Sequence, residues 1–330
     1  METEIVLVDS SVNKEETYSQ AVEILRNGDI VAFPTETVYG LGADATNPQA
    51  VEKIFTAKGR PSDNPLIVHV DSKESALNWV QNVPAKAIQC MDAFWPGALT
   101  IILESKPGAF AENVTANLKT VGIRVPNHRV ALDLLARVNV PIAAPSANTS
   151  GKPSPTLAEH VYHDMAGIIP LILDGGQTTI GLESTVLDMT SEPPVILRPG
   201  EITKEDLELV IGTVRLSSEI QGNAPKSPGM KYIHYAPDVP VYLIENDEAL
   251  VGKAIQHVQK EGKKVAVLST ADFPVADYHF PLSAETLYDS LRKCDQTDAD
   301  LILATVSTAS NRSDAMMNRL EKAADHKWFS

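Results

Sequence analysis

The first two thirds of the chain alternate between helix-like and strand-like patterns of apolar residues. Apolar residues at helical spacing predict helices over 15–27, 48–57, 73–93 and 127–138. Short apolar runs with β-branched residues predict strands. They cover 30–33, 66–70, the end of 94–103, 120–126, 141–144, 171–176, 184–189 and 195–200. Short strands with few long helices between them predict an α/β domain with a twisted mixed sheet, ending near residue 212.

From residue 239 onward, strands and helices alternate, apart from two consecutive strands at 263–269 and 278–283. The predicted strands cover 239–244, 263–269, 278–283 and 300–305. The predicted helices cover 247–261, 284–294 and 313–324. This order predicts a smaller C-terminal domain over 239–330 with a doubly wound, Rossmann-like parallel sheet. Its turn at 268–272 lacks the glycines of a phosphate-binding fingerprint.

Residues 213–238 have the glycine and proline content of a connector between the domain of 1–212 and that of 239–330. The stretch 227–237 nevertheless contains a methionine, two tyrosines and a histidine, and disordered linkers are poor in such groups. We therefore expect an ordered linker. It serves either as a strap between the domains or as a lid with aromatic contacts to a ligand.

Composition and charge narrow the class of protein. The 330 residues are 43% hydrophobic and 22% charged, as in soluble globular proteins. With 28 Lys and Arg against 43 Asp and Glu, the net charge of −15 argues against broad capture of nucleic acid or membrane, so any tRNA contact is local or transient. Cys90 and Cys294 have no metal-ligand spacing. No signal peptide and no run near about 18 apolar residues occurs, which predicts a cytoplasmic protein without a membrane segment.

The loop after the helix of 48–57 carries the clearest chemical signal. Lys58 and Arg60 flank a glycine, and Pro61 and Pro65 stiffen the backbone that follows. Two cations held in a defined loop indicate an anionic ligand. A surface turn with two solvated cations is the alternative for so short a motif.

Other polar residues stand within or after predicted strands. Arg124 and Arg198 lie in apolar runs, and the charge of Arg124 must either point to solvent or meet a carboxylate or a phosphate. His69 is either a hydrogen-bonded core residue or a ligand-binding one. The loop of 141–156, dense in Ser, Asn, Gly and Pro, directly follows a strand, as ligand-binding loops of α/β sheets do, although a flexible linker has the same composition. Together these residues predict a pocket for a phosphorylated ligand and a carboxylate.

Several familiar motifs are excluded. The string Gly-x-Gly-x-x-Ala at 40–45 imitates a dinucleotide fingerprint, but residues 34–39 separate it from the preceding strand. No Walker A, kinase, GxSxG or HExxH pattern occurs. The stretch 146–155 lacks a second activating lysine or serine-rich partner for amidase chemistry.

Eight strings, in order, resemble the YrdC-like threonylcarbamoyl-adenylate synthases in their two-domain form. They are PTETVYGLGADA (34–45), KGRPSDNPLIVHV (58–70), FWPGALTIIL (94–103), VGIRVP (121–126), APSANTSGKPSPT (144–156), GLESTVLD (181–188), ILRPGEI (196–202) and SPGMKYIHYAP (227–237). The resemblance covers roughly residues 15–240. Residues 310–324 depart from the two-domain form, because they lack its glycine-containing stretch.

The resemblance implies a YrdC-like fold and a nucleotidyl transfer. A carbamate formed from L-threonine and bicarbonate attacks the α-phosphate of ATP, which gives threonylcarbamoyl-AMP and pyrophosphate for N6-threonylcarbamoyladenosine (t6A) formation in tRNA. It implies Mg²⁺ bound through the ATP phosphates, no metal ligands from the protein, and downstream threonylcarbamoyl-transferase proteins. The alternatives are an RNA-binding or regulatory protein on the same fold, and a carbamoyl-phosphate-handling enzyme, whose usual zinc-finger and acylphosphatase segments this chain lacks.

The resemblance also implies roles for individual residues. The catalytic set is Lys58, Arg60, Ser146 and Asn148. The ATP-binding set is Arg60, Asn64, Thr120, Ser146, Ser154, Arg198 and Tyr235. The threonine-binding set is Thr37, His69, Arg124, the backbone of Ala144, and Ser184. Within these sets, Arg124 holds the threonine carboxylate and Tyr235 closes over the nucleotide.

Overall fold

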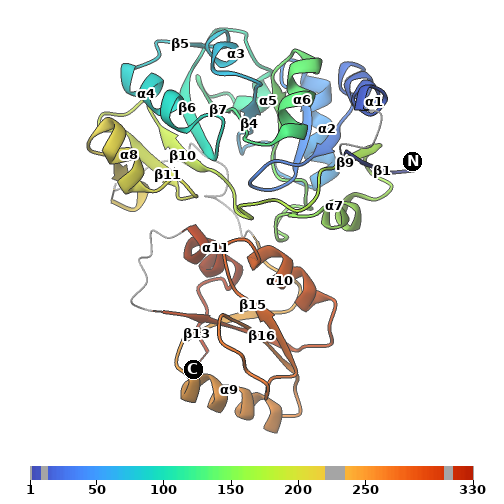
Figure 1. Cartoon of the computed structure of the whole chain (residues 1–330), viewed down its shortest axis with the longest axis vertical. Coiled ribbons are helices and arrows are strands. Elements are labelled where there is room, and N and C mark those ends of the chain that lie inside the picture. Colours follow the sequence, from blue (N-terminus) through green and yellow to red (C-terminus); the bar gives the residue numbers. More distant parts are fainter. Residues whose placement is uncertain (1, 9–13, 220–234, 308–314, 330) are drawn as a thin grey trace. The chain divides into compact units, whose positions relative to one another are not determined.

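The protein consists of two compact units, each with its own β-sheet (Figure 1). The computed structural model describes residues 2–8, 14–219, 235–307 and 315–329. The first unit comprises Met1–Ser150 and Pro155–Lys231, and the second comprises Gly151–Ser154 and Tyr232–Ser330. The expected linker over 213–238 falls mostly on residues 220–234, which lie outside the described residues.

The first unit contains a mixed sheet, which confirms the fold class expected from the sequence. In the described residues its strands lie in the order β1 (Glu4–Leu7), β9 (Leu171–Asp174), β2 (Val31–Phe33), β3 (Gly40–Asp44), β8 (Ile142–Ala143), β4 (Ile67–His69), β7 (Thr120–Arg124), β6 (Leu99–Ser105), β10 (Thr185–Asp188), β11 (Val195–Arg198) and β12 (Arg215–Leu216), with β5 (Val80–Gln81) paired to β6. Neighbours such as β4 and β7 are parallel, whereas β7 and β6 are antiparallel.

Helices cover both faces of this sheet. They are α1 (Lys14–Arg26), α2 (Pro48–Lys58), α3 (Lys73–Leu77), α4 (Ala85–Phe94), α5 (Glu112–Thr115), α6 (Arg129–Val138), α7 (Ala158–Met165) and α8 (Lys204–Ile211). Side chains alternate along a strand, and in β2 Val31 and Phe33 join the core beneath α1 and α6, whereas Ala32 joins the core that contains α2, α4, α5, α7 and α8. Among the described residues, the core of α1 and α6 takes its fully buried strand residues from β2, β8 and β9, and Val6 of β1 packs against it.

The predicted helix before the Lys58 loop forms as expected. Asn47 caps α2 by accepting hydrogen bonds from the backbone N–H groups of Gln49 and Ala50 at 3.0 and 3.2 Å. Pro48 occupies the first helical turn, and Gly59 ends the helix in the left-handed conformation at φ 59°. These local signals place Lys58 at the last turn of the helix.

One expectation about local structure differs from the structure, and the exclusion of a dinucleotide fingerprint at 40–45 is confirmed. The prediction of a helix over 73–93 was wrong, because this segment divides into α3, β5 and α4. Pro84 cannot continue a helix, and Asn82 adopts a positive φ of 52°. The glycines of 40–45 lie within β3, not between a strand and a helix, so they do not form a dinucleotide-binding turn. A Cβ on Gly42 would lie 2.8 Å from side-chain atoms of Phe33 and Ile142, which explains the glycine there.

The second unit confirms the parallel doubly wound architecture. Its sheet, in the described residues, has the order β13 (Val241–Glu245), β16 (Leu301–Val306), β14 (Val265–Ser269) and β15 (Tyr278–Pro281), with every pair parallel. The helices are α9 (Glu248–Lys260), α10 (Leu287–Asp295) and α11 (Ala315–Ala323). None of the helices in the described part of the chain has the length and hydropathy needed to cross a membrane.

Candidate active site

The candidate site lies on one face of the central strands of the first unit. Val68, Val121 and Ile101 point into the larger core, so their neighbours in β4, β7 and β6 point to the opposite face. Among the described residues, the core that α1 and α6 form on that face contains no residue of β4, β7 or β6. His69 and Arg124 are paired by register between β4 and β7 and therefore share this face.

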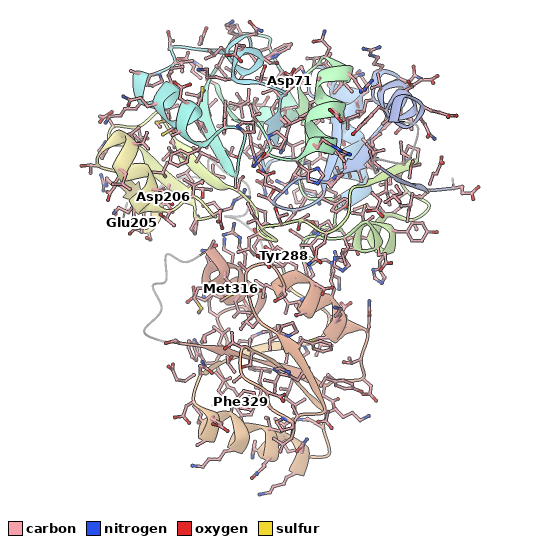
Figure 2. All side chains as sticks on the ribbon, in the orientation of Figure 1. Asp71, Glu205, Asp206, Tyr288, Met316 and Phe329 are labelled. Atoms are coloured by element: carbon pink, nitrogen blue, oxygen red, sulfur yellow. The ribbon has the colours of Figure 1, made fainter. Side chains whose placement is uncertain are left out.

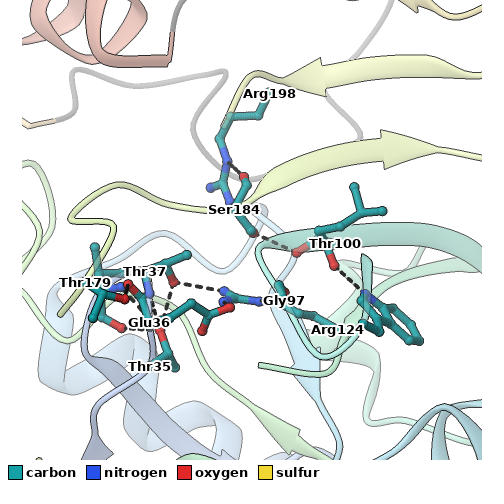
Figure 3. Close-up of polar contacts among 12 residues, drawn as sticks. Thr35, Glu36, Thr37, Gly97, Thr100, Arg124, Thr179, Ser184 and Arg198 are labelled. Carbon is teal, nitrogen blue, oxygen red and sulfur yellow. Dashed lines mark hydrogen bonds and ion pairs between the residues drawn. The ribbon is translucent and has the colours of Figure 1, made fainter. Parts of the chain in front are cut away.

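Arg124 is the centre of a buried polar cluster (Figure 3). Its side chain donates from Nε to Gly97 O at 3.0 Å and from Nη1 to Thr37 Oγ1 at 2.9 Å. Its Nη2 lies 2.5 Å from Glu36 Oε1, and the two residues are only 3% and 4% exposed. Of the possibilities that the sequence left open for this cation, which were solvent, a carboxylate or a phosphate, the structure shows a carboxylate that the protein itself supplies.

The loop that carries Glu36 and Thr37 is held by its own hydrogen bonds. Thr35 Oγ1 accepts from the N–H groups of Thr37 and Val38 at 3.2 and 3.3 Å and donates to Val38 O at 2.7 Å. The backbone of Ile180 donates to Glu36 O at 2.8 Å. The backbone beneath Glu36 is therefore fixed on two sides.

His69 is a neutral, buried imidazole beside Arg124. Burial, followed by the positive charge of Arg124, lowers the pKa of His69 to about 3. Its ring packs edge-on to Phe33 with the centroids 6.3 Å apart. No described residue forms a hydrogen bond with His69 Nδ1. A core histidine would have hydrogen bonds at both ring nitrogens, and Nδ1 has none within the described residues. This nitrogen is therefore a candidate contact for a ligand.

Ser184 and Arg198 form a second buried pair. Arg198 donates from Nε to Ser184 O at 3.1 Å and from Nη2 to Ser184 Oγ at 3.2 Å, and Ser184 Oγ lies 2.8 Å from Thr100 Oγ1. A β-bulge places Arg198 there: the register pairs Leu187 with Ile196 but Val186 with Arg198. The extra residue brings Arg198 to the face of Val186, away from the larger core that contains Ile196.

Lys58 binds the loop that follows β8. It is 2% exposed, and its Nζ donates to Ser146 O and Asn148 O, each at 2.5 Å. Ser150 N donates back to Lys58 O at 2.8 Å, and Ser146 Oγ donates to Asn148 Oδ1 at 2.6 Å. The alternative of a solvated surface lysine is therefore wrong, because Lys58 is buried against the predicted catalytic loop. The alternative of a flexible linker for this loop is likewise not supported.

The strand registers separate the predicted threonine and ATP residues along the sheet. His69 and Arg124 stand at the ends of β4 and β7, whereas Thr120 begins β7, about 13 Å away at 3.3 Å per residue. The parallel register pairs Ile67, at the start of β4, with Gly122, two residues after Thr120. Arg60 donates from Nη2 to Asn64 O at 3.4 Å, and Asn64 is buried.

Two predicted ATP contacts belong to the second unit. Ser154 is buried in the segment Gly151–Ser154. The ring of Tyr235, at a φ of 68°, stacks on Tyr288, which is labelled in Figure 2, with the centroids 5.4 Å apart, and Arg319 lies 5.8 Å from its centre. Closure of Tyr235 over a nucleotide stays a prediction.

Some residues of the site had not been assigned from the sequence. Glu36 stood inside the polar string of 34–45, and its position between two threonines was the available signal. Thr100 was a lone hydroxyl in a buried strand, and Gly97 contributes only its carbonyl oxygen. Among the residues with described positions, no three His, Cys, Asp or Glu side chains lie close enough to hold a metal ion.

The fold and site define a class of protein: a YrdC-like mixed α/β domain with a buried arginine cluster, followed by a parallel α/β domain. The Sua5_yciO_yrdC family model, described as "Telomere recombination", matches residues 23–200. The Sua5_C model, described as "Threonylcarbamoyl-AMP synthase, C-terminal domain", matches residues 202–325. The chain belongs to the two-domain threonylcarbamoyl-AMP synthase family.

Relatives match the chain over nearly its whole length. Threonylcarbamoyl-AMP synthase of Bacillus subtilis is 48% identical over 331 residues, which cover 96% of each protein. Threonylcarbamoyl-AMP synthase of Pyrococcus abyssi is 45% identical over 320 residues, covering 93% of this chain and 94% of the relative. The crystal structure of P. abyssi Sua5 complexed with L-threonine has a TM-score of 0.92 at 42% identity and covers 99% of both chains.

Proposed function

We propose that this protein uses ATP to convert L-threonine and bicarbonate into threonylcarbamoyl-AMP, with release of pyrophosphate. The observation that carries the proposal is the likeness, over nearly the full length, to proteins named for this activity, one of them solved with L-threonine. The first unit offers chemistry suited to two of the three substrates, L-threonine and ATP. Its threonine end contains Arg124 and a neutral His69, and its nucleotide end contains Lys58 and Arg60.

At the threonine end, the substrate carboxylate binds Arg124, whose planar guanidinium suits two carboxylate oxygens. Thr37 already accepts a hydrogen bond from Arg124 and keeps the guanidinium oriented. Neutral His69 presents Nδ1 to a polar group of the substrate. Ser184 and the backbone of Ala144 complete the threonine contacts. Both residues are buried, and Ala144 N donates a hydrogen bond to Ile67 O at 2.9 Å.

At the nucleotide end, Lys58, Arg60 and Arg198 bring positive charge to the ATP phosphates. Charge develops on the α-phosphate and on the leaving pyrophosphate as the carbamate oxygen attacks phosphorus, and fixed cations stabilise it without reorganising. Lys58 also holds the backbone of Ser146 and Asn148, so the loop is shaped before the ligand arrives. Asn64, Thr120, Ser154 and Tyr235 are the further proposed ATP contacts.

We propose that Mg²⁺ binds to the protein together with ATP. Mg²⁺ commonly binds through nucleotide phosphates and retains several waters, so it needs no group of protein carboxylates. The product is a mixed anhydride of a carbamate and a phosphate, and we propose that threonylcarbamoyl-transferase proteins in the cytoplasm consume it when they modify tRNA. With a net charge of −15, contact of this protein with tRNA is indirect or transient.

Pyrophosphate release tests the proposal. Purified full-length protein is incubated with ATP and Mg²⁺, with and without L-threonine and bicarbonate, and the nucleotides are separated by chromatography. We expect pyrophosphate and a new adenylate only when both co-substrates are present. Release that ignores threonine and bicarbonate, or no release under any combination, would overturn the proposed reaction.

A further inference from the structure

Glu36 is a buried carboxylate that the proposed reaction has not yet used. Its Oε1 lies 2.5 Å from Arg124 Nη2, but the contact is not aligned as a hydrogen bond. Neither Oε1 nor Oε2 has a hydrogen-bond partner among the described residues. A carboxylate has about four acceptor sites, and buried polar atoms are normally satisfied. Glu36 therefore has unused capacity to accept hydrogen bonds inside the site.

The charges of the cluster show which ligand group matches this capacity. Arg124 and Glu36 form a neutral pair on a buried face, and the histidines near them, His69 and His128, both have a lowered pKa because they are buried. An amino acid is also neutral in sum, since it carries one carboxylate and one ammonium. A carboxylate placed on Arg124 alone would leave two buried charges unpaired, the ammonium and Glu36, which is strongly unfavourable.

An exchange of partners satisfies all four charges. The substrate carboxylate binds Arg124, and the Glu36 carboxylate, once released from Arg124, binds the substrate ammonium. The backbone of Glu36 is anchored by Ile180 and by the turn at Thr35, so the exchange needs only rotation about side-chain bonds. Figure 3 shows Glu36 and Arg124 side by side, with Thr37 between the anchored turn and the guanidinium.

We propose that Glu36 binds the ammonium group of the amino-acid substrate and, without substrate, occupies Arg124 in place of the substrate carboxylate. This inference rests on the proposed function, and it makes Glu36 the residue that selects α-amino acids over other carboxylates. A ligand without an amine must displace Glu36 from Arg124 and offers the displaced carboxylate nothing in return. The same contact orients the nitrogen that becomes the carbamate nitrogen.

Two ligands that differ only in the amine test the role of Glu36. Calorimetry measures binding of L-threonine and of (R)-3-hydroxybutyrate, which keeps the hydroxyl and the carboxylate, to the full-length protein and to Glu36→Gln. We expect the variant to bind L-threonine roughly tenfold or more weakly, since a charge-assisted hydrogen bond is lost. We expect it to bind (R)-3-hydroxybutyrate more tightly than the wild type does, because no carboxylate then competes for Arg124. Glu205→Gln, an exposed position on α8 labelled in Figure 2, is the control and leaves both affinities unchanged.

The opposite signs separate this role from a structural one. Loss of both affinities by the same factor would make Glu36 only a support for Arg124, and no change in either would also overturn the proposal. If circular dichroism shows that Glu36→Gln does not fold, Glu36→Asp provides the test. This variant keeps the negative charge, so we expect it to bind L-threonine more tightly than (R)-3-hydroxybutyrate. Equal affinities of Glu36→Asp for the two ligands would refute the proposal. Failure of the wild type to bind L-threonine would refute the proposed function instead.

Discussion

Replacing Arg124 with alanine tests the buried cluster most directly. The change removes the donors to Gly97 O and Thr37 Oγ1 and leaves Glu36 buried without its counter-ion. A stranded buried charge costs about 3–5 kcal/mol, and each lost hydrogen bond about 1 kcal/mol. These costs overlap, because all of them follow from the loss of one guanidinium, so we expect the free energy of unfolding to fall by about 3–5 kcal/mol.

Urea unfolding and steady-state kinetics measure the two effects of Arg124→Ala. We expect Arg124→Ala to lower kcat/KM for L-threonine by a factor that corresponds to a loss of transition-state stabilisation on the order of 2–4 kcal/mol. The KM for ATP should change little. Adding Glu36→Gln to the variant removes the stranded charge and should restore part of the stability. Arg129→Ala, at an exposed position of α6, is the matched control. Equal losses for L-threonine and ATP, or an unchanged unfolding midpoint, would refute this reasoning.

Three further predictions concern other parts of the structure. Lys58→Met leaves Ser146 O and Asn148 O without their buried donor, so we expect a stability loss of about 2–4 kcal/mol in urea and a raised KM for ATP; an unchanged KM would contradict the role of this loop. The pKa of His69 is about 3 in the folded state, so between pH 6.5 and 3 the unfolded chain binds a proton that the folded protein does not. As the pH falls through this range, the free energy of unfolding decreases by roughly 1.4 kcal/mol per pH unit. His69→Asn should flatten the pH dependence of the unfolding midpoint, and a curve parallel to that of the wild type would refute this. Arg292 donates to Pro153 O at 2.6 Å within the second unit and so holds the segment of Ser154, a proposed ATP contact. Arg292→Ala should therefore raise the KM for ATP and leave the KM for L-threonine unchanged. Equal changes in both would point to general destabilisation.

Signals within a few residues determined much of the fold. Asn47, Pro48 and Gly59 bound α2 as their capping chemistry requires. The alternation of strands and helices after residue 239 predicted the parallel second unit, because each apolar run can be buried only by its neighbours. The sequence also indicated that Arg124, if it is buried, needs a carboxylate or a phosphate as its partner. Where local signals competed, as at Asn82 within the expected helix of 73–93, a turn prevailed over the helical pattern.

Contacts between distant segments decided the site. The sequence by itself determined which residue types a phosphate- and carboxylate-binding site would use, since their chemistry belongs to the side chains. Only the tertiary structure decided that Arg124 pairs with Glu36, that Lys58 is buried against the loop after β8, and that a bulge turns Arg198 to the face of the site. Strand order, register and bulges follow from the packing of the whole sheet, and no local pattern specifies them.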